Sequence, residues 1–214
     1  MADIDYKQLI SFKLMKEVMQ EKKITSVELS KKCGCSADLI SMIIKGKATP
    51  KTDLFVKFCY FLGEMPSKIC EFKDITKKPW FEGRSYFYIP EQDAKGELTY
   101  RPLRRLLDAY IDEANATLAD GAEKKTADTF YDMVTPNRRR NGNFDKSMKG
   151  MKMALEARGL TTGKKETRNR RDYSKGLPYK TRTKLRRDEP INLGTVYDMC
   201  KVLGCSPDWV VSYK

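Results

Sequence analysis

Residues 24–50 read ITSVELSKKCGCSADLISMIIKGKATP, and their local signals agree on two short helices joined by a tight turn. Thr25 and Glu28 have the spacing of a capping box, in which each side chain satisfies a free amide at a helix start. Gly34 can adopt the left-handed conformation that ends a helix, and Ser36 can cap the next one. The stretch therefore predicts a helix-turn-helix.

Apolar residues on either side of the turn recur at helical spacing. Ile10, Leu14 and Val18 are four residues apart, which predicts one buried face of a helix before the motif. In the second helix of the motif we expect Ile40 to point inward, together with one of the isoleucines at 43 and 44. These faces would close a small helical core around the motif.

The run 24–50, continued by FLGEMPSKI at 61–69, resembles the lambda-repressor-like (xenobiotic-response-element type) helix-turn-helix family. The resemblance covers residues 9–73, about a third of the chain, and implies a five-helix DNA-binding domain. Ile44 departs from the family pattern, which commonly has Glu there. The pattern of helix-two Leu, turn Gly, capping Ser, buried Ile, terminal Gly and Pro falls on Leu29, Gly34, Ser36, Ile40, Gly46 and Pro50.

By position, this resemblance implies that the second helix of the motif enters the major groove. The side chains that would face base edges are Ala37, Asp38, Ser41 and Met42. Those that would approach phosphates are Ser26, Ser36, Lys45, Lys47, Thr49 and Lys51. Asp38 could instead serve only to stabilise the start of its helix, where a carboxylate complements the macrodipole. Lys45 and Lys47 could likewise be ordinary solvated lysines.

Two pieces of this domain recur later in the chain, in the same order. TADTFYDMV at 126–134 parallels SADLISMII at 36–44, with an offset of 90 residues. Residues 200–214 parallel 59–73 through the shared pattern Cys-x-x-Leu-Gly-x-x-Pro, with an offset of 141. The domain is therefore predicted to occur twice, and the difference between the offsets (141 − 90 = 51) predicts an insertion of that length in the second copy.

The second copy carries its own candidate contacts. Residues 103–118 are predicted to form a long helix, but a separate second helix between it and residue 126 cannot be identified. We expect Thr126 to cap a helix that points Phe130 and Met133 inward. The side chains that would face bases are Ala127, Asp128, Tyr131 and Asp132. Those that would contact phosphates are Thr126, Asn137, Arg138, Arg139, Arg140, Arg168, Arg170, Arg171, Lys180, Arg182, Lys184, Arg186 and Arg187.

Most of the positive charge lies in the expected insertion. Residues 137–189 hold 18 Lys and Arg and 6 Asp and Glu, a net charge of +12 within a chain of net +13. We expect a helix at 144–158, and we expect much of 160–187 to be mobile in the free protein and held near phosphates in a complex. The alternative is a disordered, solvated insertion without contacts.

Composition excludes several classes of protein. The chain has no histidine, so neither a Ser-His nor a Cys-His catalytic pair can form. GLTTGKK at 159–165 has only three residues between its glycines, too few for a P-loop. Four of the six cysteines could in principle bind zinc, but they form no CxxC pair. We expect no enzymatic activity, no cofactor and no metal site, and the absence of a long apolar run or a signal sequence predicts a cytoplasmic protein without membrane contact.

We therefore predict an all-α fold with two lambda-repressor-like helix-turn-helix bundles, at 1–73 and 98–214, joined by an aromatic connector at 74–97. The predicted function is sequence-specific binding of double-stranded DNA by a repressor-type transcriptional regulator of a bacterium or mobile element. Two alternatives stay open: a DNA-binding accessory factor for conjugation, excision or replication, and a helix-turn-helix inhibitor or interaction module that binds protein or RNA. The chain could act as a homodimer or as a single-chain pseudo-dimer, and the second copy could bind DNA or serve for association.

Overall fold

The structure is a computed structural model, and it describes residues 6–76, 94–116, 118–119, 121–134 and 176–214. Several sequence predictions lie outside these residues: most of the connector, the helix expected at 144–158, and the basic side chains of the insertion up to residue 175. Among them are Asn137, Arg138, Arg139, Arg140, Arg168, Arg170 and Arg171.

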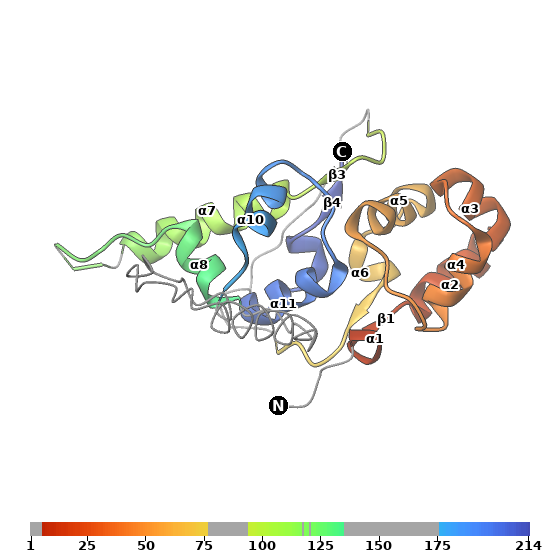
Figure 1. Cartoon of the computed structure of the whole chain (residues 1–214), viewed down its shortest axis with the longest axis horizontal. Coiled ribbons are helices and arrows are strands. Elements are labelled where there is room, and N and C mark those ends of the chain that lie inside the picture. The colour runs from red at the N-terminus through yellow and green to blue at the C-terminus, as the bar shows by residue number, and fades with distance from the viewer. Residues whose placement is uncertain (1–5, 77–93, 117, 120, 135–175) are drawn as a thin grey trace, which may run out of the picture.

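The N-terminal half is a bundle of short helices closed by a two-stranded ribbon (Figure 1). Strand β1 pairs antiparallel with β2, and Ile10 lies opposite Phe72, so the chain near the start of the bundle adjoins its last element. The elements are α1 (Tyr6–Leu9), β1 (Ile10–Ser11), α2 (Lys13–Glu21), α3 (Ser26–Cys33), α4 (Ala37–Ile44), α5 (Thr52–Leu62), α6 (Pro66–Ile69) and β2 (Glu71–Phe72).

The face predicted for the first long helix is wrong. Met15 and Met19 are its buried side chains, at 0% and 5% exposed, whereas Leu14 and Val18 are only half-buried. Ile10 is buried, but it lies in β1 and not in the helix. Because α2 starts only at Lys13, its helical phase cannot be extrapolated from Ile10, and the buried stripe is shifted by one residue.

The C-terminal half has a related order of elements. Strand β3 pairs antiparallel with β4, and Leu98 lies opposite Tyr213, so this half also begins and ends in one ribbon. Among the described residues, no helix lies between α7 and α8, where the N-terminal half has α3. The elements are β3 (Leu98–Thr99), α7 (Arg101–Ala116), α8 (Ala127–Met133), α10 (Tyr179–Arg186), α11 (Leu193–Leu203), the short 3-10 helix η2 (Pro207–Trp209) and β4 (Ser212–Tyr213).

Residues 176–187 are the described part of the segment 160–187, much of which is expected to be mobile in the free protein; residues 160–175 lie outside the described residues. Helix α10 belongs to the predicted insertion, yet it packs in the C-terminal half with Leu185 only 1% exposed. The backbone amide of Leu177, just before this helix, donates to the Tyr131 carbonyl of α8 at 2.8 Å. One apolar side chain and a few specific hydrogen bonds thus attach residues 176–187 to the C-terminal half.

The two halves pack directly on each other, with α5 against β3 and β4, and α6 against η2 (Figure 1). The buried Thr52 hydroxyl lies 2.7 Å from the Tyr100 hydroxyl, and it accepts from the backbone amide of Ile191 at 3.0 Å. Lys51 and Asn192, which precede α5 and α11, form an isolated antiparallel bridge. The all-α prediction holds for most of the described chain, apart from the two small ribbons, and no described helix is both long and apolar enough to cross a bilayer.

Asp188 ties the C-terminal half together and gives it a dependence on pH. Its carboxylate accepts from Arg104 at 2.9 Å and from the Tyr100 backbone amide at 2.8 Å. Burial raises the pKa of Asp188, but the hydrogen bonds from Arg104 and Tyr100 and the nearby positive charges outweigh it, so the pKa is lowered overall. A carboxyl group with a lowered folded-state pKa stabilises the fold above its unfolded pKa, and this contribution is lost as pH falls.

We therefore expect acid to destabilise the protein through Asp188. The stability of the wild-type chain should begin to fall near the unfolded-state pKa of about 4, and the loss should continue as pH drops through the lower pKa of the folded state. Asp188→Asn should be less stable than wild type at neutral pH and should lose less stability in acid. Urea denaturation at neutral pH and at acidic pH measures the free energy of unfolding of both proteins under each condition. If the variant and the wild type lose the same stability in acid, Asp188 does not contribute to the acid destabilisation.

Candidate nucleic-acid interface

The helix-turn-helix begins at a fully formed capping box. The Thr25 backbone amide donates to the Glu28 carboxylate at 2.8 Å, and the Glu28 amide donates to the Thr25 hydroxyl at 3.2 Å. Hydrogen bonds from the Thr25 backbone and hydroxyl lower the pKa of Glu28. Gly34 ends α3 in the left-handed region at φ 69°, as the sequence predicts. The start of α3 is therefore set by local hydrogen bonds, and its end is set by one glycine.

Helix α4 has one buried and one exposed face. Its Ser36 cap accepts from the Leu39 amide at 3.1 Å. Ile40 and Ile43 are both 0% exposed, which identifies 43 as the second inward position, since Ile44 is only half-buried. Burial of these two isoleucines against the rest of the bundle fixes how α4 is rotated about its axis. The opposite side of the helix faces solvent and is accessible to a partner.

The predicted base-reading side chains lie on that outer side. Asp38 is exposed and Met42 is 42% exposed, while Ala37 and Ser41 are half-buried. Positions 37, 38, 41 and 42 lie one helical turn apart in pairs, so they share one face. The geometry brings the four predicted side chains together at the start and middle of α4.

The predicted phosphate contacts flank α4 at both ends. Ser36 lies at its start, and Lys45, Lys47, Thr49 and Lys51 follow its end; all five are exposed. Ser26, in the first turn of α3, is half-buried. A left-handed Gly46 at φ 69° turns the chain back, and the Lys47 amide closes this turn on the Met42 carbonyl at 2.8 Å. The loop after α4 therefore presents lysines next to the outer face of the helix.

In the C-terminal half, α8 departs from the predicted pattern. Phe130 is buried as expected, but Met133 is 51% exposed and Tyr131 takes the inward position at 4% exposed. Met133 as a core residue and Tyr131 as a base-reading residue are therefore corrections to the sequence prediction. The reason is α10, which covers the side of α8 that carries Tyr131: the Arg182 guanidinium lies 5.6 Å from its ring centre.

Arg182 also binds the two acidic side chains predicted to read bases from α8. Its guanidinium donates to Asp128 at 2.9 Å and to Asp132, and its Nε donates to the Leu177 carbonyl at 2.9 Å. Arg186 lies 3.6 Å from Asp128. Arg182 is only 13% exposed, which makes it a structural link between α10 and α8 and not a free phosphate contact. Thr126 and Ala127, the remaining predictions here, are exposed and half-buried.

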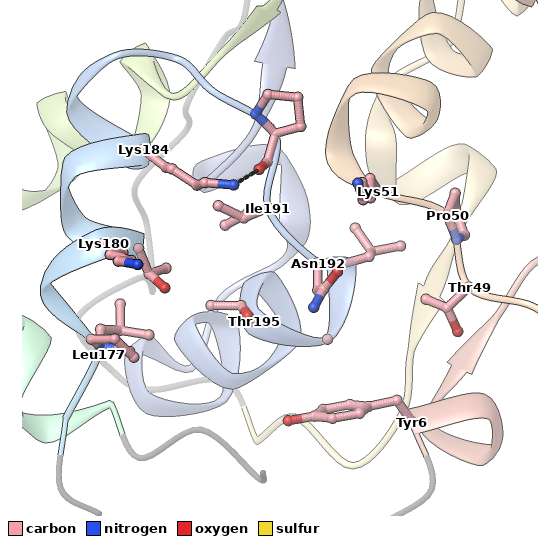
Figure 2. Close-up of a pocket in the computed structure, with 15 residues that line it drawn as sticks. Tyr6, Thr49, Pro50, Lys51, Leu177, Lys180, Lys184, Ile191, Asn192 and Thr195 are labelled. Atoms are coloured by element: carbon pink, nitrogen blue, oxygen red, sulfur yellow. Dashed lines mark hydrogen bonds between the residues drawn. The ribbon is translucent and has the colours of Figure 1, made fainter. Parts of the chain in front are cut away.

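A cleft of about 510 Å³ lies between the two halves (Figure 2). Thr49, Pro50 and Lys51 form one wall, and Lys180 and Lys184 of α10 lie across from them. Sequence reasoning assigned these lysines to phosphates separately, without predicting that they meet. It missed Asn192 and Thr195, which also line the cleft. Extending the offset of 141 back from Cys200 would have aligned Asn192 with Lys51.

The cysteines are packed as small apolar residues. Five of the six are buried and Cys35 is half-buried. Burial raises the pKa of Cys33 to about 12, so the thiol stays protonated at neutral pH. Within the described part of the chain, no group of acidic or cysteine side chains is arranged to hold a metal ion.

Comparison with known proteins agrees with the geometry of the N-terminal half. Residues 15–74 match the Cro/C1-type HTH DNA-binding domain, and the match ends before the C-terminal half. No curated protein and no solved structure matched the chain. The family predicted from residues 9–73 is confirmed for this segment, whereas the second copy stays a prediction. Residues 15–74 are therefore similar to the Cro/C1-type helix-turn-helix DNA-binding domain.

Proposed function

We propose that this protein is a repressor-type transcriptional regulator that binds duplex DNA in a sequence-specific manner, with α4 in the major groove. The observation that carries the proposal is the exposed face of α4 within a Cro/C1-type domain, followed by a lysine-bearing loop. Asp38 can accept a hydrogen bond from cytosine N4, and Met42 can touch a thymine methyl group. Lys45 and Lys47 are positioned to contact the backbone that borders the groove.

We also propose that the C-terminal half is a second, degenerate copy of the domain. Two contacts between the halves support this, because each joins residues that the offset of 141 makes equivalent. Lys51 bridges Asn192, and the Ser67 amide donates to the Asp208 carboxylate at 2.8 Å. Equivalent residues meet one another only near a two-fold axis, as in an isologous dimer. A single-chain pseudo-dimer accounts for both contacts.

The two copies would not read DNA equally. The described residues form no helix between α7 and α8, and Asp128 and Asp132 are bound by Arg182. We therefore assign base reading to α4 and give the C-terminal half a part in association and in backbone contact. Because only α4 reads bases, we expect the DNA site to be asymmetric, with a defined base sequence in one half only.

Substitutions in and beside α4 test the proposal. Target duplexes are first selected from a random pool with the full chain. Asp38→Ala should then change the preference at a single base pair by about 1–3 kcal/mol, because it removes one base contact. Lys45→Ala should weaken all duplexes similarly and lower the salt dependence, because it removes a phosphate contact. Affinities for selected and random duplexes, measured over a salt series, separate the two effects.

Lys16→Ala serves as a matched control, because Lys16 is exposed on α2 and belongs to neither predicted set. Equal losses on selected and random DNA for Asp38→Ala would exclude it from base reading. A map of bound sites in the genome then distinguishes the roles. Binding over the protein's own promoter supports a regulator, whereas binding at a transfer or recombination origin supports an accessory factor. A preference for RNA or a protein partner over duplex DNA would overturn the proposal.

A further inference from the structure

The cleft between the halves collects positive charge from both of them. Lys51 comes from the loop before α5, and Lys180 and Lys184 come from α10, far away in the sequence (Figure 2). None of the described residues that line the cleft is acidic. All three lysines are exposed, so their ammonium groups can reach a ligand in the opening. The cleft therefore has a local charge of about +3 at neutral pH.

Acidic side chains near the cleft in sequence are engaged elsewhere. Asp188 accepts from Arg104 and from the Tyr100 amide, and Glu189 lies 3.9 Å from Arg187. Both carboxylates thus have arginine partners, and neither lines the cleft. Two further carboxylates lie close by: Asp198 accepts from the hydroxyl of the cleft-lining Tyr6 at 2.6 Å, and Asp53 lies in the first turn of α5. The three lysines outnumber these two carboxylates, so an entering anion would meet a net attraction.

Neutral polar groups complete the lining. Thr49 and Thr195 each bring a hydroxyl group, and Asn192 brings an amide between the two walls (Figure 2). Helices α5 and α11 both begin here, and neither residue before them, Lys51 or Asn192, caps its helix with a side-chain hydrogen bond. The helix starts add positive potential to that of the lysines, although the lysines carry the larger charge.

We propose that this cleft binds a phosphate group, which either the DNA backbone or a small phosphorylated molecule supplies. Phosphate suits the site because its charge and its several acceptor oxygens match three ammonium groups and neighbouring hydroxyl and amide donors. At 510 Å³, the cleft falls in the range of about 300–1,000 Å³ typical of small-molecule sites, so it has room for the group attached to the phosphate. The DNA source rests on the proposed function, whereas the small-molecule source does not.

The site also gives the association of the halves a consequence for binding. Lys51 belongs to the helix-turn-helix half and the other two lysines belong to the C-terminal half, so one phosphate would contact both. Neither half alone contains all three lysines. The cleft forms because the two halves pack together at Lys51 and Asn192, so the complete site requires both halves.

The experiment compares the full-length wild type with the triple variant Lys51→Ala, Lys180→Ala and Lys184→Ala. The control carries Lys57→Ala and Lys201→Ala, which remove exposed lysines from α5 and α11 outside the cleft. Because Lys184 donates to the Pro190 carbonyl at 3.4 Å, a double variant at Lys51 and Lys180 leaves that hydrogen bond intact and guards against misfolding. Circular dichroism verifies folding of each protein.

Two measurements identify the source of the phosphate. In the first, affinity for a short fluorescent duplex is followed over a salt series. If DNA supplies the phosphate, the slope of log affinity against log salt should fall by about 0.9 for each phosphate that the variant no longer neutralises, and the control should keep the wild-type slope. In the second, inorganic phosphate and ATP are titrated calorimetrically. If a small molecule is the ligand, wild type and control should bind ATP or phosphate, and the affinity of the cleft variants should fall at least tenfold.

Unchanged salt slopes together with unchanged titrations in the cleft variants would overturn the proposal, as would equal losses in the control. Failure of the wild type to bind any duplex would contradict the proposed function, while calorimetry would still decide whether the cleft binds phosphate. Failure of the wild type in both measurements would reject the cleft as a phosphate site.

Discussion

Replacing Ile40 with alanine should lower the free energy of unfolding by about 2–5 kcal/mol. Ile40 is 0% exposed in the middle of α4, so the substitution removes buried methyl groups and leaves a cavity beneath the proposed reading helix. DNA affinity should fall as well, because the outer face of α4 depends on this packing for its position. Urea denaturation followed by circular dichroism measures the loss of stability.

Met42→Ala is the matched control on the opposite side of the same helix. Met42 is 42% exposed, so its stability effect should stay within about 0.5 kcal/mol of wild type. If Met42 reads a base pair, this variant should lose sequence preference while keeping its fold, the reverse of the Ile40 variant. Equal denaturation midpoints for the two variants would contradict the burial pattern of α4.

Replacing Tyr100 with alanine should destabilise the protein by about 3–5 kcal/mol, the usual effect of deleting a large buried ring. Tyr100 is 0% exposed, and its hydroxyl lies 2.7 Å from Thr52 and 3.2 Å from the Glu189 carbonyl. It therefore joins the start of α5 to the chain that leads into α11. Urea denaturation measures the total effect on stability.

Tyr100→Phe separates the ring from its hydroxyl group. The variant keeps the packing and loses only hydrogen bonds, so we expect a smaller effect of about 0.5–1.5 kcal/mol. Hydrogen exchange provides a second measurement: Tyr100→Ala should accelerate exchange in α5 and α11 together, because the side chain joins the start of α5 to the segment before α11. Acceleration confined to α11 would show that the halves unfold independently.

The helix-turn-helix could be predicted from the sequence because its determinants are local. Thr25, Glu28, Gly34 and Ser36 act through hydrogen bonds or backbone conformation within three or four residues, and each takes its predicted role. The shifted face of α2 has a different origin. Pairing of Ile10 with Phe72 joins residues far apart in sequence, and helical periodicity contains no information about it.

The C-terminal half was less predictable because its contacts are long-range. Tyr131 is inward because α10 packs on α8, and the Arg182 contacts with Asp128 and Asp132 span about fifty residues. The positive charge of this segment predicted phosphate contacts, and no local pattern distinguishes Arg182 from its neighbours. The convergence of Lys51 with Lys180 and Lys184 likewise depends on how the halves pack.

The ribbon of β1 and β2 has a consequence for engineering. Because Ile10 and Phe72 lie side by side, the chain enters and leaves the helix-turn-helix bundle at neighbouring points. A segment with adjoining ends can be grafted into a surface loop of a host protein without stretching either one. Residues 10–72 thus have the adjoining ends that such a graft needs, and the host would have to replace the buried contacts of Thr52 with Tyr100 and Ile191. Leu98 and Tyr213 likewise bring the ends of the C-terminal half together, the arrangement that circular permutation requires.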